Sequence, residues 1–224
     1  MKIVKVEALM VDRFCFARIE TDKGLIGVGE SGTWGHLEAS AAAITKFGEY
    51  LKGKDPRYIE HHWNVMHRAH HFIGAAISGA IAAIDIALWD IKGKHYGVPV
   101  YELLGGKMRD KCRLYAHAKG RTREALVEEA VRLKQDGFTA LGHLNPLLDE
   151  DESTPYYKSH AQKIEDAAET IRQIREAVGP SVDLCVEIHR RMTPPEAVAL
   201  ARAIEQYKPM FFEDPLRPTD PDAM

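Results

Sequence analysis

Two carboxylates and an imidazole stand near the ends of neighbouring apolar segments. Glu187 and His189 lie two positions apart at the end of segment 182–188, and Glu213 ends segment 210–213. Side chains two apart on a strand share a face, and neighbouring strands lie about 4.8 Å apart. Both carboxylates can therefore share a hard cation such as Mg²⁺, which favours carboxylate oxygen. The alternative is that they are solvent-facing charges at loop edges.

These segments belong to a regular alternation of strands and helices that begins at about residue 112. The expected strands are 113–118, 138–144, 182–188 and 210–213, and the expected helices are 122–136, 160–178 and 193–207. Such alternation predicts a parallel sheet with right-handed crossovers. A complete (β/α)₈ barrel needs roughly 250 residues and places its active site at the C-terminal strand ends. Domain 112–224 is therefore expected to hold the first half of a TIM-like barrel, about four strands, in a truncated chain.

The first part of the sequence, 1–111, has a different pattern. Alternating segments at 3–9, 14–20 and 25–30 predict a small antiparallel sheet. Helices are expected at 36–51, 58–70 and 75–94, with a domain boundary near 109–111. The sequence therefore predicts an α+β domain that precedes the barrel strands.

Composition and charge narrow the class of protein. The chain is 45% hydrophobic and 28% charged, with a net charge of −3, which is typical of a soluble globular protein. Without a basic stripe, neither nucleic acid nor an anionic membrane is an expected partner. The apolar run 75–91 contains Asp85 and Asp90, so a core helix is favoured over a membrane span.

The three cysteines are far apart in the sequence. Cys15, Cys112 and Cys185 each lie in an apolar, strand-like context, so we expect buried free thiols in a reducing compartment. Met1 leads directly into strand-like alternation, without a signal peptide. Both observations favour a cytoplasmic location.

Three passages together resemble the enolase superfamily, in its mandelate racemase and muconate lactonizing enzyme branch. They are 19–30 (IETDKGLIGVGE), 80–94 (AIAAIDIALWDIKGK) with 103–106 (LLGG), and 187–189 (EIH) with 212–215 (FEDP). The resemblance covers almost the whole chain. It implies an α+β capping domain followed by a (β/α)₇β barrel.

The resemblance also implies a magnesium site. Members of the superfamily hold Mg²⁺ with three carboxylates at the ends of strands three, four and five, and Glu187 and Glu213 match the first two. The third ligand would lie beyond Met224. Glu187 replaces the more usual Asp, so a shifted ion or backbone must accommodate one added methylene group.

The sugar-acid dehydratases of this branch, such as galactonate and gluconate dehydratases, place a general acid at the position of His189. The implied reaction is a β-elimination, in which a proton leaves C2, Mg²⁺ stabilises an enediolate, and His189 protonates the departing 3-hydroxyl. The alternative for His189 is a polar residue that caps a strand. Other members carry a Lys-x-Lys pair at the end of strand two. Residues 140–145 (ALGHLN) contain no lysine, which favours a hydro-lyase whose base, a later His, is absent from this chain.

Weaker candidates for substrate binding lie elsewhere. His143 is a candidate substitute base, although alternation does not fix the face on which it lies. Trp34, His36 and His71 belong to segments that, by resemblance, fold over the barrel mouth. The histidines between 61 and 71 are otherwise expected on a polar helix face. The acidic loop with residues 149–157 is expected to act as a lid or subunit contact.

Two other functions remain open. One is an epimerase or racemase of acid sugars in the same superfamily. The other is a non-catalytic fragment that acts as a binding or assembly module, because half a barrel exposes strand edges and should be inactive alone. The expected partners are a small-molecule carboxylate sugar and further copies of the chain. The sequence does not identify the sugar acid.

Overall fold

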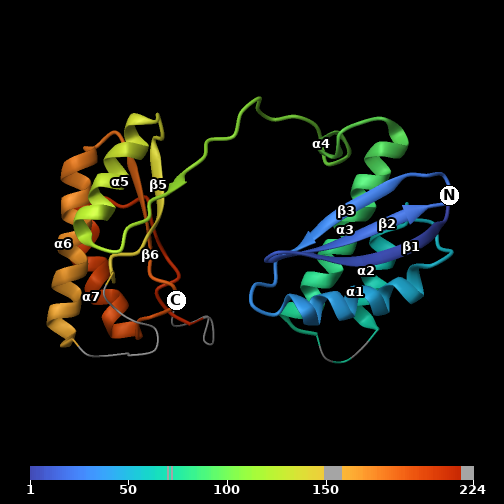
Figure 1. The fold of residues 1–224 in the computed structure, drawn as a ribbon, viewed down its shortest axis with the longest axis horizontal. Helices are drawn as coiled ribbons and strands as arrows, with labels where there is room; N and C mark the ends of the chain where they lie inside the picture. The colour runs from blue at the N-terminus through green and yellow to red at the C-terminus, as the bar shows by residue number, and fades with distance from the viewer. Residues whose placement is uncertain (70, 72, 149–157, 218–224) are drawn as a thin grey trace. The chain divides into compact units, whose positions relative to one another are not determined.

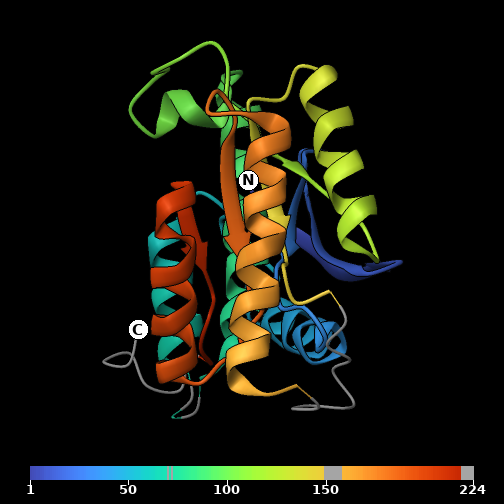
Figure 2. The same ribbon diagram turned by 90° about the vertical axis from the view of Figure 1, so that its left-hand side faces the viewer.

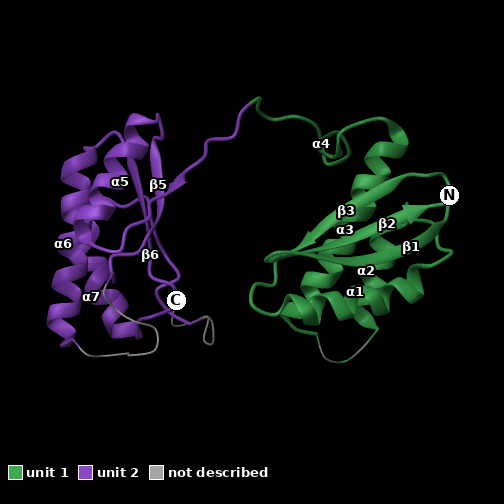
Figure 3. Ribbon diagram, viewed as in Figure 1, with its two compact units in different colours: residues 1–110 green, residues 111–224 purple. Residues whose placement is uncertain are grey.

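The computed structural model describes residues 1–69, 71, 73–148 and 158–217, which form two compact units. The units are Met1–Asp110 and Lys111–Met224 (Figure 3). Each unit has its own cluster of buried apolar side chains. The acidic loop at 149–157 lies outside the described residues.

The first unit is an antiparallel sheet covered on one face by helices (Figure 1). Its strands pair in the order β1-β2-β3. The elements are β1 (Ile3–Val11), β2 (Phe14–Thr21), β3 (Ile26–Ser31), α1 (Leu37–Leu51), α2 (Ile59–Arg68), α3 (Ala75–Tyr96) and α4 (Val100–Leu103). Every second residue of β2 is buried, as expected when one face of a sheet packs on a core.

Two glycines let α3 approach β3 closely. A Cβ atom at Gly27 or Gly29 would lie 2.1 Å from a backbone carbonyl oxygen of α3, that of Ala87 or Ala83 respectively. The α3 backbone occupies this space, together with side-chain atoms of Ile91 at Gly27 and of Ile86 at Gly29. The GVGE sequence of β3 is therefore a packing requirement of this unit.

One helix prediction in this unit is wrong in part. His62 of α2 does not lie on a polar face but is buried, at 1% exposure. Its Nδ1 lies 3.0 Å from the Tyr50 hydroxyl and its Nε2 lies 2.8 Å from the carbonyl oxygen of Asp55. Burial lowers the pKa of His62, so the ring is held as a neutral, hydrogen-bonded core residue.

The second unit is a parallel sheet in the order β4-β5-β6-β7. Figures 1 and 2 show α5, α6 and α7 side by side on one face of this sheet. The elements are β4 (Ala116–His117), α5 (Arg123–Gln135), β5 (Ala140–Leu144), α6 (His160–Val178), β6 (Asp183–Glu187), α7 (Pro194–Ile204), the 3₁₀ turn η1 (Glu205–Tyr207) and β7 (Phe211–Glu213). No helix in the described part of the chain is long and apolar enough to cross a membrane.

The first predicted strand of this unit is shorter than expected. Only Ala116 and His117 pair with β5, opposite Leu141 and Gly142, whereas the sequence predicted strand from 113 to 118. Cys112 precedes this strand and is exposed, so the prediction of a buried thiol is wrong there. Cys15 and Cys185 are buried as predicted.

Candidate active site

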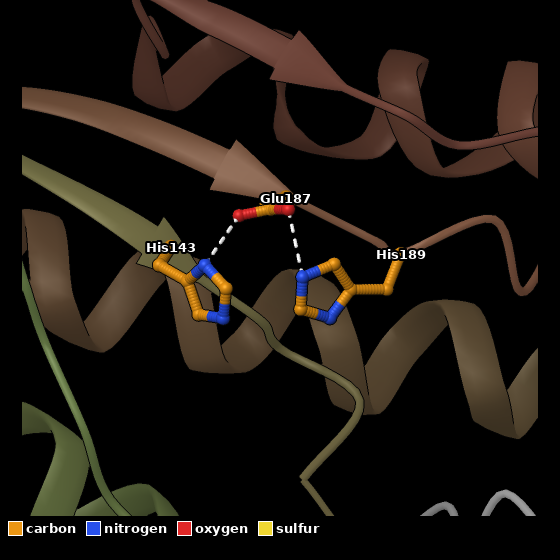
Figure 4. A group of neighbouring side chains, drawn as sticks. All are labelled: His143, Glu187 and His189. Carbon is orange, nitrogen blue, oxygen red and sulfur yellow. Dashed lines mark ion pairs between the residues drawn. The ribbon is translucent and has the colours of Figure 1, made fainter. Parts of the chain in front are cut away.

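The C-terminal ends of β5 and β6 bring one carboxylate between two imidazoles (Figure 4). Oε2 of Glu187 lies 2.7 Å from Nδ1 of His143, and Oε1 lies 2.7 Å from Nε2 of His189. The Glu187 side chain is 13% exposed. Its two oxygens are thus each held in hydrogen-bond distance of a ring nitrogen.

Strand pairing places the second predicted carboxylate on the same face. Leu184 and Val186 are buried in the core beneath the helices, so Glu187 projects from the opposite face of β6. Glu213 pairs directly with Glu187 across β6 and β7 and therefore shares that face. The two carboxylates lie at the C-terminal ends of neighbouring strands, as the sequence predicted.

His143 reaches this face through an irregularity in β5. The pairing register of β5 and β6 shifts between Leu141 and Leu144, and both of these leucines are buried in the same core. Strict alternation would place His143 beneath the helices with Leu141. Instead His143 has a positive φ of 55°, and the extra residue, as in a β-bulge, turns its side chain toward Glu187.

A stack of aromatic rings fixes the orientation of His143. Its ring stacks on that of His117, with centroids 4.8 Å apart and planes at 16°. His117 in turn stacks on Tyr115 at 5.5 Å. Gly142 leaves room for the stack, because a Cβ atom there would lie 2.1 Å from the Tyr115 ring.

The pKa values of two neighbouring groups are raised by their surroundings and by nearby negative charge. Partial desolvation, followed by the charges of Glu213 and Glu187, raises the pKa of Tyr115. Burial also raises the pKa of the Cys185 thiol, with Asp183 and Glu213 adding to it. Cys185 is therefore a neutral thiol and a poor nucleophile.

The two chain segments stay hydrogen-bonded beyond the ends of β6 and β7, although the regular register ends there. Three backbone hydrogen bonds join the two segments, from Ile188 N to Glu213 O (3.1 Å), from Arg190 N to Asp214 O (2.6 Å) and from Met192 N to Pro215 O (3.0 Å). His189 lies within this stretch at a φ of 56°. The Arg190 guanidinium also pairs with the Asp214 carboxylate at 2.8 Å. The backbone that carries His189 is thus tied to the neighbouring strand.

A pocket of about 520 Å³ opens beside this cluster. His143 and His189 line it together with three basic residues, Lys119, Arg121 and Arg191. Cationic side chains around a concave site favour anionic ligands. The pocket is therefore suited to a small acid.

Comparison with known proteins decides the family. Residues 4–105 match the mandelate racemase / muconate lactonizing enzyme N-terminal domain, and residues 124–224 match the enolase C-terminal domain-like family. The chain belongs to the mandelate racemase / muconate lactonizing enzyme branch of the enolase superfamily.

Several curated relatives carry the name D-galactonate dehydratase. The chain is 38% identical over 223 residues to a D-galactonate dehydratase of Variovorax paradoxus, and 41% identical over 219 residues to one of Verminephrobacter eiseniae. Each alignment covers 96% of this chain and 56% of the relative. The chain thus spans about half the length of the curated relatives it matches.

Solved structures agree on the fold. An enolase from Pantoea ananatis with bound D-gluconate and Mg is 28% identical, with a TM-score of 0.88 over 99% of this chain and 61% of its own. A superfamily member from Salmonella Typhimurium gives 28% identity and a TM-score of 0.89, over 99% and 63%. In superfamily terms, the antiparallel unit is the capping domain, and the parallel sheet is part of the TIM-like barrel, as predicted.

The donor atoms at the sheet edge fit the magnesium ion that enolase-superfamily enzymes use. Glu187 and Glu213 offer carboxylate oxygens from paired strand positions, which is the donor chemistry that Mg²⁺ prefers. The methylene that Glu187 adds relative to Asp extends its carboxylate to both imidazoles. The roles of Glu187 and Glu213 as metal ligands remain predictions, as does the role of His189 as an acid.

The other predicted substrate contacts belong to the capping domain. The Trp34 side chain is 71% exposed, with the Arg13 guanidinium 5.4 Å from its ring centroid. His36 immediately precedes α1 and is exposed, as is His71. The structure describes the two units separately, so a role for these three residues in substrate binding also stays a prediction.

Four residues at the barrel site were not predicted from the sequence. They are Tyr115, His117, Lys119 and Arg121. Tyr115 and His117 are two apart in the first predicted barrel strand, so the same alternation that paired Glu187 with His189 would have paired them. The basic pair follows that strand directly, at the end where barrel active sites form.

Proposed function

We propose that this chain forms the capping domain and first barrel strands of a Mg²⁺-dependent sugar-acid dehydratase. The observation that carries the proposal is the contact of 2.7 Å between His189 and Glu187, beside a pocket lined by basic side chains. A proton donor thus adjoins a carboxylate suited to Mg²⁺. The galactonate dehydratases among its relatives and the gluconate in a structural neighbour point to an aldonate or aldarate as the substrate.

Each side chain has a distinct role in this reaction. Lys119, Arg121 and Arg191 attract the acid into the pocket by charge. Glu187 and Glu213 would hold Mg²⁺, which when bound supplies positive charge against the charge that develops as C2 loses its proton. His189 donates a proton from its ring to the leaving 3-hydroxyl, and Glu187 fixes the direction of that ring.

The test uses the protein that carries this chain, with Mg²⁺ and a panel of aldonates and aldarates. We expect dehydration to a 2-keto-3-deoxy acid for at least one substrate. His189→Asn should lower dehydration by roughly 10²–10⁴-fold, because the leaving hydroxyl then lacks its proton donor. Exchange of the C2 proton with D₂O should persist in this variant.

Two outcomes would contradict the proposal. Undiminished dehydration by His189→Asn would remove the acid role. Deuterium incorporation at C2 by the unaltered protein, without loss of water from any substrate, would instead identify an epimerase or racemase.

A further inference from the structure

The cluster at β5 and β6 contains ligand atoms that Mg²⁺ does not favour. Nδ1 of His143 and Nε2 of His189 flank Glu187, and the three residues each offer one ligand atom within 4.8 Å of the others. Mg²⁺ prefers oxygen ligands, whereas imidazole suits zinc and other transition metals. Glu187 is therefore shared by two donor sets. One contains carboxylate oxygens only, with Glu213, and the other adds the imidazole nitrogens of His143 and His189.

We propose that His143, Glu187 and His189 form a binding site for a transition-metal ion of the Zn²⁺ class. Two histidines and one carboxylate, with positions left open for water, are a recurrent donor set for such ions. Zinc–ligand bonds of about 2.0–2.2 Å place neighbouring ligand atoms roughly 3–3.5 Å apart. The two contacts of 2.7 Å with Glu187 have to open to that spacing, and the two imidazoles, whose ligand atoms lie within 4.8 Å of each other, have to reach the same spacing. Side-chain shifts of roughly 1 Å are sufficient for both changes.

The site is largely formed before any ion arrives. The stack on His117 orients the ring of His143, and the rings of His143 and His189 meet edge to face, with centroids 4.5 Å apart. Both histidines also line the pocket of about 520 Å³, which gives an ion and its water ligands access. Preorganised side chains lose little conformational entropy on binding.

The two donor sets are mutually exclusive at one carboxylate. A transition metal at this site would engage Glu187, the shared ligand, and Nε2 of His189, whose ring the dehydratase reaction needs as a proton donor. Zn²⁺ would therefore inhibit dehydration. This consequence rests on the proposed function, whereas the site itself does not.

Calorimetric titration of the chain with Zn²⁺ and, separately, with Mg²⁺ tests the site. His143→Asn and His189→Asn should each weaken Zn²⁺ binding by at least about tenfold and leave Mg²⁺ binding within a few-fold. Glu213→Gln should do the reverse. Glu187→Gln should weaken both ions.

Two control variants cover adventitious zinc binding. His160→Asn removes an exposed imidazole at the start of α6, and Cys112→Ser removes an exposed thiol; neither should change the affinity of the site. Co²⁺ gives a second measurement, because its visible absorption spectrum changes when nitrogen enters its coordination sphere. That change should disappear in the two histidine variants.

The results separate this site from the proposed function. Zn²⁺ affinity unchanged in both histidine variants, or lost in Cys112→Ser, would overturn the transition-metal site and leave the magnesium site untouched. Mg²⁺ affinity that is unchanged in Glu187→Gln and Glu213→Gln would count against the dehydratase site. Zn²⁺ binding that depends on the two histidines would still support the inference. Far-UV circular dichroism of each variant confirms that it is folded.

Discussion

The left-handed backbone conformation of His143 decides which side chains meet in the candidate site. His143 would lie beneath the helices if β5 were regular, but its positive φ and the register shift bring it to Glu187. Alternation was sufficient to anticipate the neighbourhood of Glu187, His189 and Glu213, because all three lie at or just beyond regular strand ends. Alternation could not place His143, because a bulge depends on pairing with a neighbouring strand and produces no periodic pattern in the sequence.

The close packing of Gly142 against the Tyr115 ring can be tested by adding a methyl group. In Gly142→Ala the new methyl group would enter the Tyr115 ring, which would have to leave its stack on His117. We expect a loss of about 1–3 kcal/mol in the free energy of unfolding, measured by urea denaturation. Gly32→Ala, where no atom lies within 4 Å of the added carbon, is the matched control.

Removal of the Tyr115 ring should relieve that clash. In the Tyr115→Ala background, Gly142→Ala should cost much less than in the unaltered chain, which a double-mutant cycle measures as coupling. Equal costs in both backgrounds would show that the ring does not limit this position.

Asp55 gives the capping domain a defined pH response. Hydrogen bonds from the Arg57 guanidinium, at 2.6 to 3.2 Å, lower the pKa of Asp55 from 3.8 to about 2. A carboxyl whose pKa is depressed by folding stabilises the folded state above its unfolded pKa, and this contribution is lost as pH falls toward the folded pKa. The contribution should therefore be complete above about pH 4–5 and gone near pH 2.

Comparison with Asp55→Asn isolates this response. The difference in unfolding free energy between the two chains should be largest above pH 5 and should shrink steadily between pH 4 and pH 2. Because the Arg57 side chain is 39% exposed, salt should reduce the difference. A difference that stays constant from pH 6 to pH 2 would contradict the assignment.

At the scale of elements, helix ends were easier to predict than strand ends. Thr122 caps α5 as expected, and α6 has the predicted bounds, with the Ser159 hydroxyl accepting a hydrogen bond from Gln162 N. Caps are local signals, read from a few adjacent residues. The length of β4 instead depends on how many residues its partner strand can reach, and only two of the expected six pair.

The capping box of α7 provides the test at this scale. The Thr193 backbone N–H and hydroxyl each donate to the Glu196 carboxylate at 2.8 Å. Burial alone would raise the pKa of Glu196, but these bonds, with the charge of Lys163, bring it below its ordinary value. Thr193→Ala should cost about 1 kcal/mol of unfolding free energy, measured by thermal or urea denaturation.

Serine is the control at this position. Thr193→Ser keeps the hydroxyl and should retain most of the stability, whereas Thr193→Ala should not. Equal losses in the two variants would assign the effect to the methyl group of threonine instead of the cap.

At the scale of the whole molecule, each unit is held by its own apolar core. Ile84 is fully buried in the capping domain and Ile171 in the barrel unit. Helical periodicity was enough to anticipate both, because every turn of an amphipathic helix repeats the signal. Burial of single residues such as His62 was not predictable, since it depends on partners from other elements.

Core substitutions should act mainly within their own unit. Ile171→Ala removes a fully buried side chain and should cost about 2–5 kcal/mol, with the largest rise in amide hydrogen exchange in α5, α6 and α7. Ile84→Ala should raise exchange most in α1 and α3. The exposed positions Val198 and Ile86, 50% and 49% exposed, are matched sites whose change to Ala should have little effect. A uniform rise across both units would contradict this division.

The backbone hydrogen bonds that join the segments after β6 and β7 have a consequence for engineering and divergence. Each segment supplies half of a shared ladder, from Ile188 to Met192 on one side and from Glu213 to Pro215 on the other. A loop transplanted from a homologue at one of these positions would arrive without its counterpart. The two loops therefore form one exchangeable cassette, and chimeras that swap them together should succeed where single swaps fail.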